Sequence, residues 1–236
     1  MKNVLYKGAR FVKSLPKTLY FNFHYFPFKV ALKLPVFVDY KVRFMKLEGD
    51  IKLNYAPRRF EVKIGGSDTV LVDKKYNRTI WKSEGTVIFH GPFKLAHSTV
   101  ISVERSAVLE FGENGLINAG TKIICTKRIS IGKAASIAWL CTFIDSDFHD
   151  IVDENNITVN PDEEIIIGDY VWIGHDCTVK KGVHIASWTI LASNSLAIKD
   201  ITEEKQTWGG NPARWIRTGY WRPSLMKSDG YNFSYR

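Results

Sequence analysis

The stretch that decides the fold is IGDYVWIGHDCTVKKGVHIASWTILASNSLAIKD, residues 167–200. Apolar or small residues recur in it at intervals of six, at Ile167, Ile173, Val179, Ile185, Leu191 and Ala197. Small or β-branched residues follow four positions later, at Val171, Cys177, Val183, Thr189 and Ser195. A period of six fits neither the 3.6-residue repeat of a helix nor the two-residue repeat of a simple strand. It is typical of a parallel β-helix, in which each hexapeptide forms a short strand and a corner and three hexapeptides complete one coil.

The same phase can be followed upstream from Leu95 to Phe143, where it breaks, and it resumes at Ile167. The 23 residues between them, 144–166, are therefore predicted to leave the coil as a loop. Such insertions lie on one face of a solenoid and often carry its binding site. Before Leu95, short strands are predicted at 61–64, 69–72 and 86–89, as an irregular entry to the coil.

Composition places this chain of 236 residues among ordinary globular proteins. It has no apolar run long enough to cross a bilayer, and no signal peptide is expected. The three cysteines, Cys125, Cys141 and Cys177, fall in phase with the repeat and match no metal-site spacing. We interpret them as small core residues in a reducing cytoplasm.

Charge is concentrated in residues 1–60, which hold 13 Lys/Arg and 3 Asp/Glu. This segment is also aromatic, and Pro16, Pro27 and Pro35 argue against a long helix there. We interpret it as a region that caps the first coil. The alternative is that it lies close to the inner, cytoplasmic face of the membrane. No recognised nucleic-acid-binding motif accompanies the charge, so no nucleic-acid partner is expected.

The predicted loop begins IDSDFHDI and holds eight carboxylates but no Lys or Arg. His149, among carboxylates on a loop that projects from a rigid coil, is the candidate general base, because imidazole exchanges protons near neutral pH. Asp147 and Asp145 are candidates for orienting it. The alternative is that these aspartates only shape the turn and that His149 is solvated.

The hexapeptides, the loop bearing His149, VWIG (171–174), KKGV (180–183) and GNPARWIR (210–217) together resemble the left-handed β-helix acyltransferases. The most similar branch is the O-acetyltransferases of maltose, galactosides and surface glycans, over roughly residues 118–217. The resemblance implies an all-β, left-handed parallel β-helix that uses acetyl-CoA as co-substrate and forms a homotrimer. It also implies that acetyl-CoA lies along the coil between neighbouring subunits.

Carried over residue by residue, the resemblance assigns proton abstraction to His149 and substrate or oxyanion contact to Asn118. It places acetyl-CoA near His175, Ser193 and Lys199, although the family usually has a small residue where His175 stands. Independently of the resemblance, Trp139 lies one strand before the loop and is a candidate for the wall of the acceptor pocket, together with Asp145; the alternative is that Trp139 simply points outward.

The tail suggests a short C-terminal helix. Asn211 and Pro212 suit a helix start, and Arg214 and Arg217 would then share one helix face. Two guanidinium groups on one face suit CoA phosphates, and a solvated helix face is the alternative.

These observations predict a cap (1–60), a β-helix domain (61–217) with its loop at 144–166, and a tail (218–236). The predicted activity is transfer of acetyl from acetyl-CoA to a hydroxyl of a sugar or surface glycan, with no metal. The alternatives are an N-acetyltransferase of an amino sugar and a non-catalytic β-helix scaffold. A zinc carbonic anhydrase is disfavoured because the six histidines show no paired ligand spacing.

Overall fold

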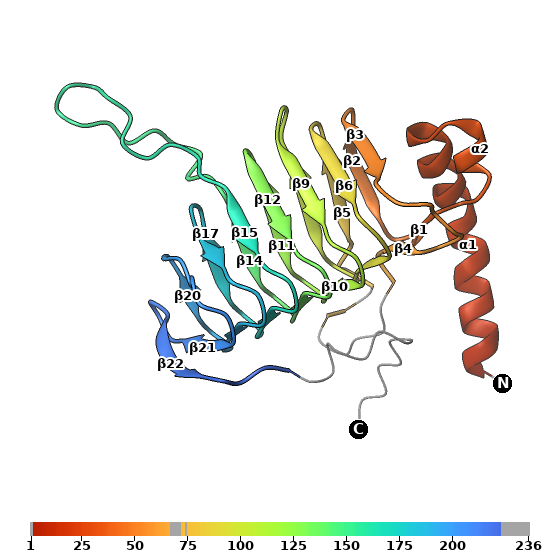
Figure 1. The fold of residues 1–236 in the computed structure, drawn as a ribbon. Helices are drawn as coiled ribbons and strands as arrows, with labels where there is room; N and C mark the ends of the chain where they lie inside the picture. Colours follow the sequence, from red (N-terminus) through yellow and green to blue (C-terminus); the bar gives the residue numbers. More distant parts are fainter. Residues whose placement is uncertain (1, 67–71, 74, 223–236) are drawn as a thin grey trace.

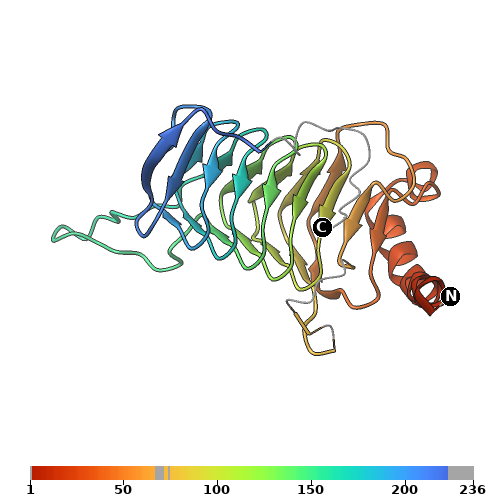
Figure 2. The same cartoon turned by 90° about the horizontal axis from the view of Figure 1, so that it is seen from below.

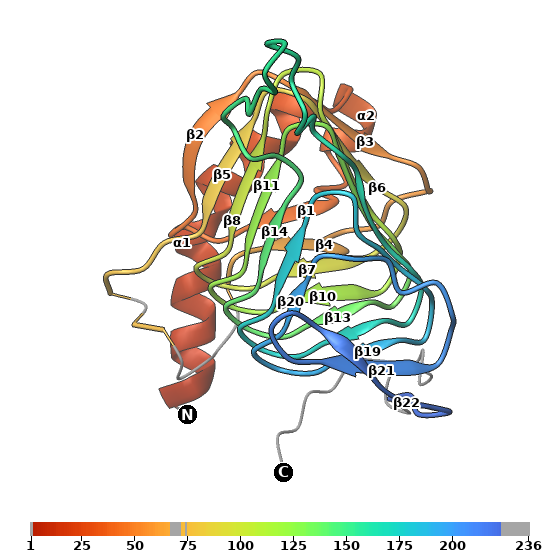
Figure 3. The ribbon, with the colours of Figure 1, turned by 90° about the vertical axis from the view of Figure 1, so that its left-hand side faces the viewer.

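The computed structural model describes residues 2–66, 72–73 and 75–222, and the side chains from Gly8 onward. The chain winds into a three-sided prism, with a long helix at one end and a projecting loop toward the other (Figure 1). Successive coils stack as parallel rungs along the prism (Figure 2), and the view along the axis shows its three faces (Figure 3).

Each face of the prism is one sheet, and from β1 to β21 consecutive strands of the chain belong to different sheets; β22 returns to the sheet of β21. Sheet A contains β1 (Val36–Val38), β4 (Val62–Ile64), β7 (Phe93–Leu95), β10 (Gly115–Ile117), β13 (Ser136–Ile137), β16 (Trp172–Ile173), β19 (Ile190–Leu191), β21 (Gln206–Gly209) and β22 (Arg214–Thr218). Sheet B contains β2 (Arg43–Leu47), β5 (Ile80–Ser83), β8 (Val100–Val103), β11 (Lys122–Cys125), β14 (Thr142–Ile144), β17 (Thr178–Lys180) and β20 (Leu196–Ala197). Sheet C contains β3 (Asp50–Leu53), β6 (Thr86–Phe89), β9 (Val108–Phe111), β12 (Arg128–Ile131), β15 (Ile165–Ile167) and β18 (His184–Ile185).

The hexapeptide phase places its repeat residues on the prism axis, as predicted. All six repeat residues of 167–200 are buried, and so are the five companion residues. Rungs pair in register, so that Ile137, Ile173 and Leu191 stack directly in sheet A. Cys125, Cys141 and Cys177 are buried free thiols in this core, and burial raises the pKa of the Cys125 thiol. The predicted parallel β-helix is confirmed.

The turns that lead from sheet A to sheet B, here called the A–B corner, repeat one backbone conformation from rung to rung. Leu140, Asp176 and Asn194 all have φ between 54° and 62°, in the left-handed region. Their amides donate to carbonyl oxygens of the preceding rung, those of Ala119, Trp139 and His175. The corner is therefore a rigid ladder, which can hold side chains at a fixed spacing.

The coil begins earlier than the sequence pattern predicted. Strands β1, β2 and β3 already pair with β4, β5 and β6 in the three sheets, so the first coil lies within residues 36–53. The boundary expected at residues 60 and 61 therefore falls inside the β-helix, and the cap is confined to the helical residues before β1. Of the entry strands, those at 61–64 and 86–89 are confirmed as β4 and β6, and residues 67–71 lie outside the described chain.

The expectation of no long N-terminal helix is wrong. Helix α1 (Lys2–Tyr25) runs for 24 residues with Pro16 inside it, and α2 (Phe28–Ala31) follows. Pro16 is exposed, so its ring does not disturb the packed side of the helix. Pro27 lies between the helices and Pro35 immediately precedes β1, so these two prolines do separate elements as expected.

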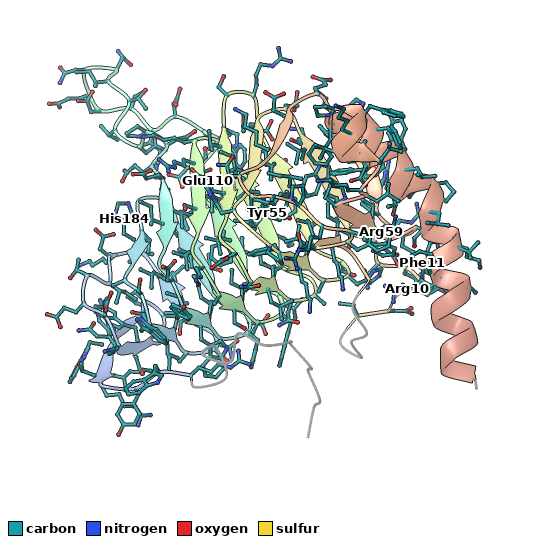
Figure 4. All side chains as sticks on the ribbon, turned by 45° about the vertical axis from the view of Figure 1, so that its right-hand side comes forward. Arg10, Phe11, Tyr55, Arg59, Glu110 and His184 are labelled. Carbon is teal, nitrogen blue, oxygen red and sulfur yellow. The ribbon has the colours of Figure 1, made fainter. Side chains whose placement is uncertain are left out.

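Helix α1 is held by polar side chains on its buried face. Ser14, Thr18 and Asn22, spaced four apart, are fully buried against the open edge of β1. Asn22 donates to the Val36 carbonyl at 2.6 Å and accepts from the Val36 amide, and Thr18 exchanges hydrogen bonds with Val38 in the same way. Arg10 adds an ion pair of 2.6 Å with buried Asp39 (Figure 4). The helix thus satisfies a strand edge that would otherwise be open to another chain.

The predicted C-terminal helix is also wrong. Residues 214–218 form β22, which pairs antiparallel with β21 at the end of sheet A. The asparagine and proline signal was overridden because an unpaired strand β21 offered backbone partners to the returning chain. Of the predicted tail, residues 223–236 lie outside the described residues. No described helix is long and apolar enough to cross a membrane.

Candidate functional site

The turns from sheet B to sheet C, here called the B–C corner, carry the loop with the candidate base. Asp145 follows β14 and is fully buried. Its Oδ1 accepts from the amide and hydroxyl of Thr126, at 2.7 and 2.8 Å, and its Oδ2 accepts from the amides of Lys127 and Arg128. Both oxygens are thus occupied by the preceding rung. Asp145 shapes the corner, as the alternative proposed, and is not accessible to a substrate.

Asp147 anchors the base of the loop to the next rung. Its carboxylate accepts from Lys181 at 2.7 Å, Asn160 at 3.2 Å and Lys180 at 3.2 Å. These hydrogen bonds, that of Lys181 first, lower the pKa of Asp147 to about 2. Asn160 also donates to the backbone carbonyl of His149 at 2.9 Å. Asp147 therefore acts on the backbone that carries His149, and not on the imidazole as expected.

His149 lies on the exposed part of this loop and lines a cleft of about 580 Å³. The cleft is polar, and Ser146, Asp147, Thr158, Asn160 and Asp162 contribute to its wall. Beyond it the loop forms a short hairpin, with Val152 bridged to Thr158, that projects from the prism (Figure 1). The arrangement presents an imidazole beside hydrogen-bonding groups that suit a hydroxyl-rich ligand.

A second cleft, of about 200 Å³, lies along the A–B corner. Asn118, Trp139, His175 and Ser193 each follow a strand of sheet A on four successive rungs and all line it. Because rungs are about 4.8 Å apart, the four residues span about 14 Å along the prism, with Trp139, His175 and Ser193 in one column and Asn118 one position out of register with them. Asn118 uses its side-chain amide to donate to the Ile137 carbonyl at 3.2 Å, which leaves its second N–H to serve a ligand.

Trp139 and His175 stack in this cleft. Their ring centroids are 5.2 Å apart and their planes differ by 2°. Nδ1 of His175 lies 3.0 Å from a carboxylate oxygen of Asp176, which fixes the ring at the rim. The structure thus groups Trp139 with the residues predicted to hold acetyl-CoA, and within one copy it is not on the cleft of His149.

Besides the small residues Ala138 and Gly174, sequence reasoning missed three residues with larger or polar side chains in the A–B cleft: Ser136, Trp172 and Arg222. The Arg222 guanidinium donates to the Ser136 hydroxyl at 2.8 Å and lies 5.3 Å from the centre of the Trp172 ring. Ser136 and Trp172 are paired neighbours in sheet A, so a strand-by-strand alignment of the repeat could have joined them. Nothing in the local sequence of Arg222 signalled that the tail returns to this face.

Arg214 and Arg217 lie on β22 and are exposed. Arg214 pairs with Gly209 and Arg217 with Thr207, across an irregularity that adds one residue to β22. Because Thr207 and Gly209 are two apart, the two arginines belong to one side of the strand pair despite the absence of a helix. Gly210, beside them, donates to Ser195, so this end adjoins the A–B corner.

Lys199 is placed apart from the other candidates for acetyl-CoA contact. It is exposed and follows β20, which puts it at the B–C corner, on the same edge of the prism as the loop of His149. Within one copy the candidates therefore divide between two corners. Asn118, Trp139, His175 and Ser193 line one, whereas His149, Asp147 and Lys199 lie at the other. Over the described residues, no group of three or more His, Cys, Asp or Glu side chains converges as a metal site.

Comparisons with known proteins agree with this fold. The chain superposes on the polySia-specific acetyltransferase NeuO with a TM-score of 0.61 and 23% identity, over 77% of this chain and 72% of that one. For the polysialic acid O-acetyltransferase OatWY the TM-score is 0.52 and the identity 18%, over 75% and 88% of the two chains. These neighbours share the hexapeptide-repeat β-helix and confirm the fold expected from the resemblance.

By sequence, the chain is similar to a probable macrolide acetyltransferase of Lysinibacillus sphaericus. The two are 34% identical over 74 residues, which are 30% of this chain and 41% of that protein. The chain thus matches about two fifths of the length of this curated relative. No family model matches the chain.

Proposed function

We propose that the protein is an acetyl-CoA-dependent O-acetyltransferase whose acceptor is a hydroxyl of a sugar or glycan. The observation that carries the proposal is the pairing of two clefts on one coil, a polar one with His149 and a narrow one along the A–B corner. The acetyltransferase folds of NeuO and OatWY and the acetyltransferase similar in sequence support the same chemistry. The buried free cysteines are consistent with a cytoplasmic enzyme.

In this proposal His149 removes the proton of the acceptor hydroxyl as its oxygen attacks the thioester carbonyl. The tetrahedral intermediate collapses with loss of the CoA thiolate, which takes up the proton held by the imidazolium. A general base of this kind contributes about 10²–10⁴-fold in rate. Asp147, through Asn160, is the positioning residue that keeps the loop backbone in place.

The A–B cleft is the proposed site of the acyl donor. Its straight row of rungs suits an extended chain such as the thiol arm of acetyl-CoA, and the second N–H of Asn118 can donate to the developing oxyanion. Arg214 and Arg217, at the far end of the row, would bind the phosphates.

A homotrimer would bring the two corners together. Proton abstraction and oxyanion contact must occur within a few ångströms, yet His149 and Asn118 line different clefts at different corners of one copy. The projecting hairpin also exposes Ile151, Val152, Ile157 and Val159, each about half exposed, which suits contact with a neighbouring copy. We therefore propose that the loop of one copy meets the A–B cleft of the next around a threefold axis.

The proposal is tested by supplying purified protein with acetyl-CoA and a panel of sugars and glycans, and measuring thiol release. Acceptor-dependent release is expected, and it should fall by about 10²–10⁴-fold in His149→Ala. His184→Ala, which removes an exposed histidine from the outer face of sheet C, is the matched control. Faster turnover of amines than of any hydroxyl would favour the N-acetyltransferase alternative, and failure to bind CoA would favour a scaffold.

A further inference from the structure

The N-terminal helix carries large apolar side chains on the face that points away from the protein. Its buried face combines Phe21, which packs against Trp81 in the core, with Ser14, Thr18 and Asn22, which are hydrogen-bonded to β1 and to the turn that follows it. On the opposite face Val12, Leu19 and Phe23 are 63%, 44% and 42% exposed. In an ordinary surface helix the outward face carries polar residues. Packing within the chain therefore does not account for the apolar set.

Helix α2 extends this surface. The Phe23 and Phe28 rings contact each other, with centroids 5.9 Å apart. Phe28 and Leu32, four positions apart, are 67% and 54% exposed. We call Val12, Leu19, Phe23, Phe28 and Leu32 the outer apolar patch. The two helices that carry it lie at the end of the prism away from the projecting loop (Figure 1), and the Phe23–Phe28 contact joins their parts of the patch.

The surroundings of the outer apolar patch are cationic. Lys13 and Lys29 are exposed on the two helices, and Lys33 is exposed in the turn that follows α2. The sequence has no Asp or Glu before Asp39, and Asp39 is itself buried and paired with Arg10. An aromatic and aliphatic face with lysines at its border is the pattern of a helix that lies in the plane of an anionic bilayer surface.

We propose that the outer apolar patch binds the protein peripherally to a bilayer containing anionic lipids. A second copy of the chain is a poorer occupant, because a symmetric contact would bring two sets of lysines together without carboxylates to neutralise them. Binding through this end would leave the loop of His149 pointing away from the lipid. The proposal concerns a surface separate from both clefts, so it does not depend on the proposed activity.

The test is co-sedimentation of the full chain with vesicles of phosphatidylcholine that contain roughly one-third phosphatidylglycerol. The native protein should bind them, bind pure phosphatidylcholine vesicles at least about tenfold less, and dissociate as salt is raised. Leu19→Gln combined with Phe28→Gln and Leu32→Gln should reduce partitioning at least about tenfold. Lys29→Gln with Lys33→Gln should also reduce it about tenfold.

Two matched controls test whether loss of any exposed aromatic residue, or of any two exposed lysines, would reduce vesicle binding as much as changes in the outer apolar patch and its lysines do. Tyr76→Gln removes a more exposed aromatic residue elsewhere, and Lys63→Gln with Lys122→Gln removes two exposed lysines from the faces of sheets A and B. Both controls should bind as the native protein does. All variants change exposed residues, so unchanged thermal unfolding is expected and is checked by circular dichroism.

Three outcomes would overturn the proposal. The native protein should dissociate from anionic vesicles only as salt is raised, so absence of binding at low salt contradicts the proposal. Equal binding of the native protein and the triple glutamine variant contradicts the role of the patch. A smaller particle mass for that variant without lipid, in sedimentation experiments, would identify the patch as a contact between copies instead.

Discussion

The A–B and B–C corners of the prism are built from the same repeat but differ in what they present. At the A–B corner, left-handed residues such as Leu140, Asp176 and Asn194 recur rung after rung, and the side chains beside them form a straight row. At the B–C corner, one turn is replaced by the loop of residues 145–164, whose base is held by buried Asp145 and by Asp147. The A–B corner is thus a regular, rigid repeat, whereas the B–C corner carries a projecting loop.

The difference between the corners shows how a solenoid can divide a reaction. A rigid row of rungs suits a long donor, because each rung adds contacts at a constant spacing. A loop can change its length and side chains without disturbing the core, so we propose that the loop selects the acceptor. If the two corners act together, they must do so between copies, and experiments that disrupt one corner at a time can test this.

The largest effect is expected from separating the two corners genetically. His149→Ala should lose about 10²–10⁴-fold in kcat and Asn118→Ala about 10²–10³-fold. Mixed trimers assembled from both variants should regain activity, up to about a quarter of the native value, because random pairing restores some interfaces that have both native residues. The measurement is thiol release from co-expressed, differently tagged chains.

Separately expressed variants mixed without subunit exchange are the control and should stay inactive. A mixture that remains as inactive as its parents after exchange would place both residues in one copy and remove the shared-site proposal.

The next effect concerns stability at the base of the loop. Asp145→Ala should lower the free energy of unfolding by about 3 kcal/mol, because it removes the buried acceptor of four hydrogen bonds from Thr126, Lys127 and Arg128. Chemical denaturation followed by circular dichroism measures it. Asp150→Ala, on the exposed loop, is the comparison and should leave the midpoint unchanged. Equal midpoints for the two variants would contradict the structural role of Asp145.

A smaller effect is expected when the loop is loosened without being unfolded. Asp147→Asn should lower kcat by about tenfold and speed proteolysis of the loop, since it removes the charge that Lys180 and Lys181 bind. Glu154→Gln, at the hairpin tip, should change neither quantity.

The pH dependence of this anchor follows from its lowered pKa. The folded pKa of Asp147 is about 2, below the unfolded value of ~3.9, so its contribution is complete above about pH 4 and is lost as the pH falls toward 2. Any acid limb of activity nearer neutrality should therefore be the same in Asp147→Asn and the native enzyme. A limb that moves in the variant would mean that Asp147 titrates in the reaction.

The smallest effect is expected at the end of the A–B row. Arg214→Ala with Arg217→Ala should raise KM for acetyl-CoA by about tenfold and leave kcat nearly unchanged, because phosphate contacts lie far from the reacting atoms. Arg59→Ala, an exposed arginine near the opposite end of the prism (Figure 4), is the control. An unaltered KM in the double variant would leave the two arginines as surface residues.

Prediction from sequence succeeded where one residue type reports one local environment. Val179 and Cys177 occur in phase with the six-residue repeat, and both are buried inside the prism as this predicts. The break in the repeat after Phe143 located the loop that bears His149. It failed at α1, where Pro16 outweighed the spacing of Ser14, Thr18 and Asn22, a polar stripe that has meaning only beside the open edge of β1. It failed again at β22, where a helix-start signal met an unpaired strand.

By itself, the sequence determined the six-residue period, the buried axis and the position of the loop, because these depend on local patterns of size and polarity. Tertiary structure alone decided that Asp145 is buried and that Arg222 returns to Ser136 and Trp172. It also decided that His149 and Asn118 belong to different corners. The reason is physical: which corner a residue occupies, and what stands opposite, depends on how many strands precede it and on contacts between segments distant in the chain.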